Sequence, residues 1–504
     1  MRVCLIQPSN IYHESVIKHA APFLPLGLGI LAQRLSLNKH KVLLLDCYTE
    51  GWELRGRIED QWIEIGTPEE EIAISLRRFK PQIVGFSVSF STQLPRLRTM
   101  ARWVKAIHPE IFVICGGALP TAIPQEILEI PEVDTVVCGE GENTLVSLLD
   151  RLESGIDFQD LSGIAYYNQR GDFIRNPMAE SVQNLDTLPL KAYDFLPLKK
   201  YFRAVSGQKL PLLTSRGCSQ ECSYCYSQQL FGDQIRYQSV ERMVQQIKHL
   251  RDSYGVREFF FDDDAILLDL PRLHELCNKM IQGDLRIQWS LRNGLIPDEI
   301  PEELLLLIKR SGGKRLQFLV GSGSRRVLQT ILRRNVNLYA LEKLIANSLK
   351  NGLRITCNFL LGHPGETLEE VYETLNYAWK LRSLGVDDFR FSLAYPFQGT
   401  ELRAQADALN CVYAYPESKF ASIEGLFSTS EFSAAEIAKI CETAELEFRS
   451  RGLMAEFARR MAIGKQLIQK PAERFFLSVA PTVQTRRMSI PSSNEVETSS
   501  EVHR

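Results

Sequence analysis

The chain has 504 residues, 44% of them hydrophobic, and its basic and acidic residues nearly balance to a net charge of −2. This length predicts about three domains with buried cores, and the even charge argues against nucleic acid as a partner. No apolar run reaches the roughly 18–20 residues that cross a bilayer. The chain opens on a strand-like run and not on a signal peptide, so we expect a cytoplasmic protein without a transmembrane segment.

Residues 1–150 alternate short apolar strands with amphipathic helical stretches. This alternation predicts an α/β domain, a Rossmann-like, doubly wound parallel sheet. Ligands of such sheets bind beyond the C-terminal ends of the strands, where the strand order reverses. The expected strands are Val3–Gln7, Lys41–Asp46, Gln82–Ser87, Ile111–Gly116 and Thr135–Cys138. The expected helices are Gly27–Leu37, Glu69–Phe79, Gln93–His108 and Gln125–Ile130.

Residues 151–210 are expected to connect this domain to the next. Within them, Gly163–Ile174 has the pattern of a small hairpin that turns near Gln169–Asp172. Three prolines, Pro189, Pro197 and Pro211, then punctuate an extended crossing segment.

Residues 211–400 resume the alternation with six expected strands, which predicts a partial (βα)6 barrel of the TIM type. Such a barrel carries its chemistry at the C-terminal mouth of its strands. Ser239 is expected to cap the helix Ser239–Leu250. The expected strands are Leu212–Ser215, Glu258–Asp262, Ile287–Leu291, Arg315–Val320, Arg354–Leu361 and Asp388–Ala394.

Residues 401–478 are predicted to form a C-terminal helical region. Its clearest helix, Ala434–Phe448, could cap the barrel or form a dimer face. Tyr413, Phe420 and Phe427 could help to shape a pocket, although such aromatic side chains are more often core. Residues 479–504 are rich in Ser, Thr, Glu and Pro, which predicts a disordered tail.

Three cysteines, Cys218, Cys222 and Cys225, follow the first expected barrel strand with spacings of three and then two intervening residues. Three thiolates on one such loop can hold three corners of a [4Fe–4S] cube and leave the fourth iron open to a non-protein ligand. A structural zinc site usually takes four ligands, and no fourth Cys or His lies nearby. The other eight cysteines are scattered, mostly in apolar runs, which argues against disulfides.

This C-x3-C-x2-C loop, with Tyr224 before its last cysteine, resembles the signature of the radical S-adenosylmethionine (SAM) superfamily. In that family SAM binds the open iron and is cleaved to a 5′-deoxyadenosyl radical. The resemblance implies that Tyr224 lies beside SAM and that Asp263 or Asp264 accepts hydrogen bonds from its amino group. An N-cap or a solvated acidic turn is the structural alternative for these aspartates.

Later turns resemble the same family. Gly362 belongs to a run that resembles its Gly-x-Pro-Gly-Glu-Thr turn, and residues 395–400 resemble its Pro-x-x-Gly-Thr turn near adenine. Ser322 belongs to a run like Gly-Ile-Glu-Ser-Gly-Ser, whose glutamate can meet the SAM ribose. Here Gly321 stands in place of that glutamate, which puts the usual ribose contact in doubt. We expect Ser322 and Gly362 to contribute to the SAM site.

Residues 1–150 resemble the cobalamin-binding domain that precedes the barrel in one large class of this superfamily. The resemblance rests on glycine-rich turns after the strands, where a Cβ would obstruct an inserted nucleotide tail. It implies a set of cobalamin-binding residues, namely Pro25, Leu26, Gly27, Asp46, Tyr48, Gly51, Ser87, Gly116, Gly117, Gly139 and Glu140.

Tyr48 marks a departure from the cobalamin fingerprint Asp-x-His-x-x-Gly, because it replaces the histidine that binds cobalt from below in Asp46–Gly51. The substitution implies that cobalt lacks a lower imidazole, which would favour low-coordinate cobalt. Alternatively, Tyr48 packs at the edge of the sheet and the domain holds no cofactor. Spacing leaves open whether Tyr48 ligates or only shields cobalt.

The resemblance implies a cobalamin-dependent radical SAM enzyme with a [4Fe–4S] cluster, SAM and cobalamin. The expected reaction is C-methylation at an unactivated carbon of a small-molecule, lipid or peptide substrate, with electrons from a flavodoxin- or ferredoxin-type donor. Members of similar layout include anaerobic tetrapyrrole cyclases and rearranging enzymes, so a reaction without methyl transfer is one alternative. A non-catalytic cobalamin or iron–sulfur module is another. No catalytic acid or base is assigned.

Overall fold

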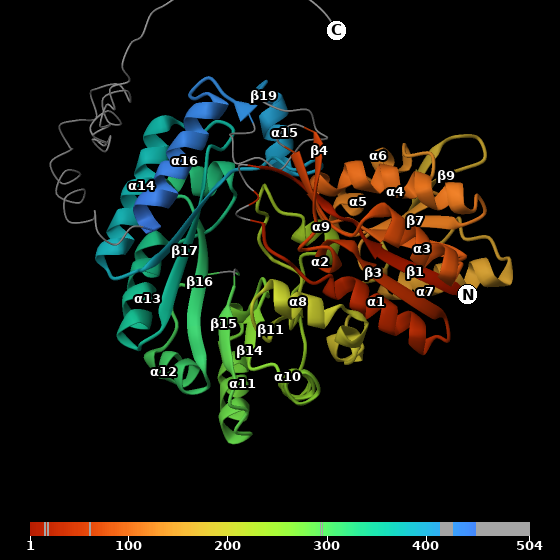
Figure 1. The fold of residues 1–504 in the computed structure, drawn as a ribbon. Helices are drawn as coiled ribbons and strands as arrows, with labels where there is room; N and C mark the ends of the chain where they lie inside the picture. The colour runs from red at the N-terminus through yellow and green to blue at the C-terminus, as the bar shows by residue number, and fades with distance from the viewer. Residues whose placement is uncertain are drawn as a thin grey trace, which may run out of the picture. The chain divides into compact units, whose positions relative to one another are not determined.

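The computed structural model describes residues 1–14, 17, 20–59, 62–292, 294, 296–413 and 427–449. Residues 1–450 form one compact unit, and Figure 1 shows its elements. Phe420, residues 450–478 and the expected tail at 479–504 lie outside the described residues, as does the side chain of Tyr413.

The N-terminal sheet has seven strands in the order β10-β9-β8-β7-β6-β1-β3 (Figure 1). Its five consecutive strands from β8 to β3 are parallel, and chain order reverses between β1 and β6, which defines the switch point. All five parallel strands lie where the sequence predicts them, to within one residue. The strands are β1 Arg2–Gln7, β3 Lys41–Asp46, β6 Ile83–Ser87, β7 Phe112–Gly116, β8 Thr135–Val137, β9 Ile164–Tyr167 and β10 Phe173–Arg175.

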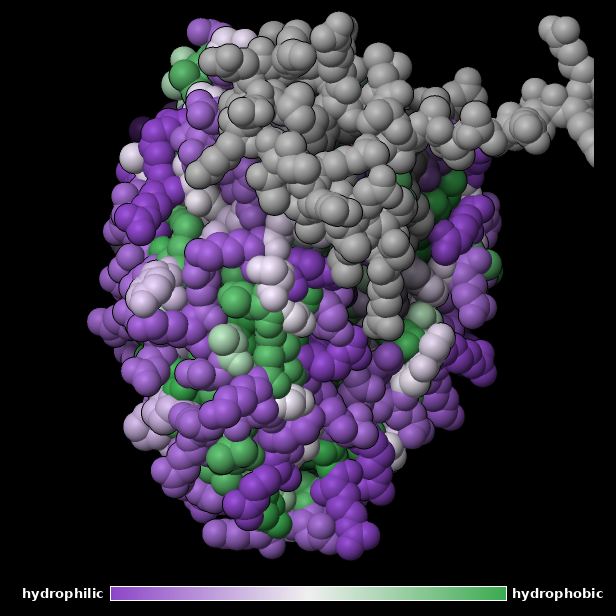
Figure 2. All heavy atoms as spheres, turned by 90° about the vertical axis from the view of Figure 1, so that its left-hand side faces the viewer, coloured by the Kyte–Doolittle hydropathy of each residue, from purple (hydrophilic) through white to green (hydrophobic). Residues whose placement is uncertain are grey.

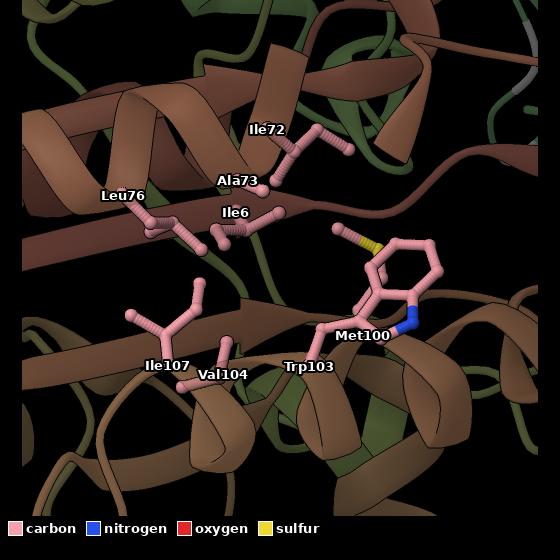
Figure 3. Close-up of a pocket in the computed structure, with 8 residues that line it drawn as sticks. All are labelled: Ile6, Ile72, Ala73, Leu76, Met100, Trp103, Val104 and Ile107. Atoms are coloured by element: carbon pink, nitrogen blue, oxygen red, sulfur yellow. The ribbon is translucent and has the colours of Figure 1, made fainter. Parts of the chain in front are cut away.

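Helices cover both faces of this sheet, as a doubly wound fold requires. One face packs against α3 Glu69–Phe79, α4 Leu94–Ile107, α5 Ala118–Ala122 and α6 Pro124–Leu128. The other face packs against α1 Leu26–Leu37 and α7 Gly141–Ser154. In Figure 3, side chains of β1, α3 and α4 point toward one another around a cavity of about 10 Å³. This space holds about one water, so it is a packing gap in an apolar core.

The predicted hairpin is present, but it belongs to the sheet. Strands β9 and β10 pair antiparallel, and β9 pairs antiparallel with β8. The sheet therefore extends into the region expected to be only a connector. Helix α7, whose apolar positions Leu145, Leu148 and Leu149 are buried, is an element that the sequence interpretation did not predict.

A second small sheet stands beside the C-terminal edge of the first, and it was not predicted either. Its order is β2-β5-β4 and all its pairs are antiparallel. The strands come from separate parts of the chain, namely β2 Asn10–His13, β4 Arg55–Glu59 and β5 Trp62–Ile65. The short helix α2 Cys47–Glu50 precedes β4.

Six parallel strands in sequential order form the partial barrel (Figure 1). They are β11 Lys209–Leu212, β14 Glu258–Phe261, β15 Gln288–Leu291, β16 Gly313–Gly321, β17 Arg354–Leu361 and β18 Asp388–Leu393. The helices between and after them are α10 Val240–Tyr254, α11 Leu270–Gln282, α12 Glu302–Arg310, α13 Leu338–Lys350, α14 Leu368–Ser383 and α15 Glu401–Ala408. The expected cap is present, since the Ser239 side chain accepts a hydrogen bond from the backbone N–H of Arg242.

The first barrel strand begins three residues earlier than predicted. Pro211 lies inside β11, opposite Phe260 of β14, and not in a crossing segment. A proline is tolerated there because β11 is an edge strand whose other side needs no ladder hydrogen bond. Ser215, expected to end this strand, instead begins the two-residue strand β12 Ser215–Arg216, which pairs antiparallel with β13 Arg236–Tyr237.

Helix α16 Ala434–Arg449 covers the last barrel strand. The Phe448 ring lies 4.8 Å from that of Phe389, 5.0 Å from that of Phe391 and 4.4 Å from that of Trp379. This packing supports the expected cap. Phe427 is 2% exposed and packs in a small core. The outer face of the barrel helices is mainly hydrophilic with a few apolar patches (Figure 2). Among the described residues, no helix is long and apolar enough to span a bilayer.

Candidate active site

The three predicted cluster cysteines lie on one loop between β12 and β13. The pairing of Ser215 with Tyr237 and of Arg216 with Arg236 closes this loop at its base. Gly217 follows at φ 91°, and a Cβ there would lie 2.0 Å from the carbonyl oxygen of Gln234. Only glycine fits such a position. We call the segment from Ser215 to Tyr237 the cluster loop, and the paired strands at its base the stem. Gly217 is thus needed to form the stem.

The cysteine side chains differ in exposure: Cys218 is buried, Cys222 is half-buried and Cys225 is exposed. Burial raises the pKa of Cys218 and of Cys222. Without bound metal the thiols are therefore protonated near neutral pH, and thiolates form when iron replaces the protons. The Ser227 N–H donates to Cys225 Sγ at 3.3 Å.

The donor set fits a cluster better than a single metal ion. Among the residues that the structure describes, no group of three or more His, Cys, Asp or Glu side chains is gathered closely enough for one ion. A structural zinc ion would need four ligands around one centre, whereas the three cysteines of a cubane each bind a different iron. Cys218, Cys222 and Cys225 would hold the cluster.

The two predicted aspartates have different surroundings. Asp263 is fully buried and accepts hydrogen bonds from Thr214 and Ser215, including 2.9 Å from Ser215 Oγ and 3.1 Å from Thr214 Oγ1. It thereby holds the chain that enters the cluster loop. Asp264 is half-buried, accepts from Ser227 Oγ at 2.6 Å, and contributes to the raised pKa of all three cysteines. Of the two, Asp264 is the one that contacts the segment after the last cysteine.

The other predicted SAM residues lie in internal networks. Ser322 is fully buried and its Oγ lies 2.8 Å from Thr374 Oγ1. A Cβ at Gly362 would lie 2.6 Å from Ile437 of α16, and the Gly362 N–H donates to Glu366 at 2.7 Å. Both residues shape turns at the barrel mouth. Their contact with SAM stays a prediction.

Arg334 is a residue that sequence reasoning missed. Its side chain is 5% exposed, and Nη1 donates to the hydroxyl of Tyr224 at 3.1 Å. Within the described part of the chain, no carboxylate forms an ion pair with it. The positive charge opposes the rise that burial causes in the pKa of Cys222. A buried cation without a counter-charge is costly, so this position suits an anionic ligand.

Gly321 and Arg334 are neighbours. Gly321 has φ 89°, and a Cβ there would lie 3.0 Å from Leu332 and 3.9 Å from Arg334 Cδ. A glutamate at 321 would be strained, as L-residues rarely adopt this φ. The position where the family has a glutamate and this chain has Gly321 therefore lies beside a buried cation, Arg334.

The predicted cobalamin residues cluster near the C-terminal edge of the first sheet. Gly117 has φ 109°, and a Cβ would lie 2.6 Å from the carbonyl oxygen of Val88. Gly51 packs on the Gly66–Thr67 backbone, where a Cβ would lie 2.0 Å from Gly66 C. Gly27 instead faces open space, with nothing within 4 Å. Close packing thus explains why glycine is needed at Gly117 and Gly51. It does not explain Gly27, where the open space leaves room for a ligand.

The remaining predicted cobalamin residues occupy turns near the same edge. Pro25 is the N-cap of α1 and Leu26 its first residue. Ser87 ends β6 and Gly116 ends β7. Gly139, at φ 78°, would place a Cβ 2.6 Å from the flexible end of Met178. Their contact with cobalamin stays a prediction.

Tyr48 and Asp46 are part of the packed structure. Tyr48 is fully buried, its hydroxyl lies 2.7 Å from that of Tyr12, and it donates to the Ala21 carbonyl at 3.0 Å. Asp46 caps α2 through the Thr49 N–H at 3.0 Å and accepts from Gln7 at 3.0 Å. Burial raises the pKa of Asp46 to about 7. In this arrangement Tyr48 lies in an aromatic cluster, and a role as a cobalt ligand stays untested.

Unpaired polar groups gather at the switch point, and sequence reasoning missed them. Asn10 follows β1, while Ser91 and Gln93 follow β6; their exposures are 2%, 1% and 0%. Asn10 Nδ2, Ser91 Oγ and Gln93 Nε2 have no hydrogen-bond partner in the described residues. Buried donors without partners are costly. They fit a ligand with many carbonyl groups, such as the amide-fringed corrin of cobalamin.

Comparisons with known proteins agree with this geometry. A model of the B12 binding domain matches residues 16–149, and a model of the radical SAM superfamily matches residues 212–378. An uncharacterized methyltransferase of Pyrococcus horikoshii is 30% identical over 454 residues, which cover 90% of this chain and 93% of that protein. The chain belongs to the cobalamin-binding radical SAM superfamily.

Two further matches support this assignment. The cytidylyl-2-hydroxyethylphosphonate methyltransferase of Streptomyces wedmorensis is 28% identical over 439 residues, 80% of each chain. The radical SAM methyltransferase TsrM of Kitasatospora setae, solved with cobalamin and a [4Fe–4S] cluster, shares the fold. Its TM-score is 0.64 at 18% identity, over 86% of this chain and 84% of TsrM. The predicted family, fold class, enzyme class and cofactor set are thus confirmed.

Proposed function

We propose that this cobalamin-binding radical SAM enzyme is a C-methyltransferase that acts on an unactivated carbon of a small-molecule, lipid or peptide substrate. One observation carries the proposal: the cluster loop packs against the cobalamin-binding domain, where its helix α9 Ser227–Phe231 contacts α5 and Tyr226 enters the core. Tyr226, next to Cys225, lies 5.9 Å from the ring of Phe397, which lies 5.9 Å from that of Phe90 after β6. Both cofactors would then face one shared substrate cavity.

The residues of this junction hold the two halves together. The Tyr226 hydroxyl donates to the Gln398 carbonyl at 2.5 Å, and Tyr226 packs in the core of the N-terminal domain. Phe90, which is 40% exposed, packs on Phe23 and Phe397, with ring centroids 6.4 Å and 5.9 Å away.

When bound, the cluster would supply the electron that cleaves SAM to a deoxyadenosyl radical, and cobalamin would supply the methyl group. The chain positions them. Asp264 would accept hydrogen bonds from the SAM amino group, and Arg334 would face its carboxylate. Tyr224, held by Arg334, would pack beside SAM. We also propose a cytoplasmic location and a flavodoxin- or ferredoxin-type electron donor, with no nucleic-acid partner.

The products formed from SAM test this proposal. Protein reconstituted with iron, sulfide and cobalamin, then given SAM and a low-potential reductant, should form both 5′-deoxyadenosine and S-adenosylhomocysteine. The first product reports radical formation and the second reports loss of a methyl group from SAM. Deoxyadenosine without S-adenosylhomocysteine would contradict methyl transfer and favour cyclisation or rearrangement. If neither product formed, both methyl transfer and the cyclisation or rearrangement alternative would be contradicted.

A further inference from the structure

The base of the cluster loop is fastened to the cobalamin-binding domain by buried charges. Arg216 of β12 and Arg236 of β13 both reach Glu140, which precedes α7. Glu140 Oε1 lies 2.6 Å from Arg236 Nη2, and Glu140 Oε2 lies 3.2 Å from Arg216 Nη1. Arg216 Nη2 also lies 2.6 Å from Glu142 Oε1. We call these four side chains the stem network.

The stem network is removed from water. Its side chains are only 3–9% exposed. Its two carboxylates and two guanidiniums balance in charge, as buried ions must. Burial alone would lower the pKa of Arg216, but Glu142 and Glu140 more than offset this and raise it. The Arg216 guanidinium therefore keeps its charge in this buried position.

Further contacts tie the stem network to the connector and to the cluster loop. Glu140 Oε2 accepts from the Val182 N–H at 2.9 Å, and Arg236 donates to the Val182 carbonyl at 2.7 Å. Arg236 also donates to the Phe231 carbonyl at 2.8 Å, and Arg216 lies over the Phe231 ring at 5.4 Å. Phe231 ends α9 Ser227–Phe231, the helix that follows the last cysteine. One carboxylate thus fixes both ends of the loop that carries the cysteines.

We propose that Glu140 is a positioning residue that sets the cluster against the cobalamin site through Arg216 and Arg236. The contact of Glu140 with cobalamin stays a prediction beside this role in holding the cluster loop. A shift of the stem would move all three cysteines together relative to the first sheet. The inference rests on the proposed function only in that both cofactors serve one cavity.

The test uses Glu140→Gln, which keeps the shape and removes the charge. Holoenzyme with cob(II)alamin and a reduced cluster is examined by electron paramagnetic resonance, because the relaxation of one spin centre depends on its distance from the other. We expect wild-type protein to give one well-defined interaction and Glu140→Gln to give a broadened, weaker one when the two are compared at equal cofactor content. Glu142→Gln, which removes only one contact, should fall between them.

Amide hydrogen exchange gives a second readout that needs no cofactor. In Glu140→Gln, amides of residues 215–237 should exchange about tenfold faster or more, since the stem opens more readily. Glu302→Gln breaks an exposed pair with Lys350 and should change neither readout. Wild-type exchange and wild-type spin interaction in Glu140→Gln would overturn the inference. If wild-type protein transferred no methyl group, the proposed function would be contradicted, but the exchange rates expected for the variants would not change.

Discussion

Replacement of Cys222 with alanine should abolish formation of 5′-deoxyadenosine while cobalamin stays bound. Cys222 supplies one of three thiolates from a loop that offers no fourth cysteine, so its loss leaves two ligands for the cluster. The predicted cobalamin-binding residues lie around the first sheet, whose two cores include none of the three cluster cysteines. Iron content, cobalamin absorbance and deoxyadenosine yield, all measured on one preparation, check this result.

A matched control is Cys277→Ala. Cys277 is a fully buried thiol in α11, away from the loop, and its loss should cost stability and not cluster content. Wild-type iron content and deoxyadenosine yield in Cys222→Ala would contradict the assignment of the cluster ligands.

Arg334→Gln should weaken SAM binding roughly 30-fold or more, because truncating one partner of a buried charge contact costs about 2–5 kcal/mol. Arg334 is 5% exposed and touches Tyr224, so the anion that it meets is well shielded from water. The affinity is measured from the change in the cluster signal as SAM is added. Arg334→Lys, which keeps the charge but not the planar guanidinium, should recover part of the affinity.

The control for this variant is Arg325→Gln, which removes the same charge from a nearby exposed position. It should bind SAM as wild type does. Equal affinities in Arg334→Gln and wild type would show that Arg334 faces no part of SAM.

The fold could be predicted where a local pattern decides the structure. The parallel strands of both sheets are apolar runs followed by helical periodicity, and they lie within a few residues of their expected bounds. The sheet β2-β5-β4 could not be predicted, because Asn10–His13 pairs with Trp62–Ile65 across a long sequence separation and both runs are only four residues long. Pro211 misled the interpretation because its tolerance depends on β11 being an edge strand. Helix α7, by contrast, has a readable apolar stripe.

The site was predictable where spacing itself carries the chemistry. The three cysteines share one loop, as their spacing requires. Asp263 and Asp264 are adjacent in sequence, so the sequence alone could not distinguish their roles. The structure shows that Asp263 is buried and accepts from Ser215, whereas Asp264 is half-buried and accepts from Ser227. Arg334 could not be found from the sequence, because the residue that it contacts, Tyr224, is 110 residues away. Glu140 gave a signal, but the sequence could not reveal that Arg216 and Arg236 are its partners.

The most direct test of the account is the electron paramagnetic resonance spectrum of anaerobically reconstituted, reduced protein before and after SAM is added. The account predicts the signal of a reduced [4Fe–4S] cluster, and this signal should change when SAM occupies the open iron. A spectrum without a cluster signal, or a cluster signal that SAM leaves unchanged, would contradict it.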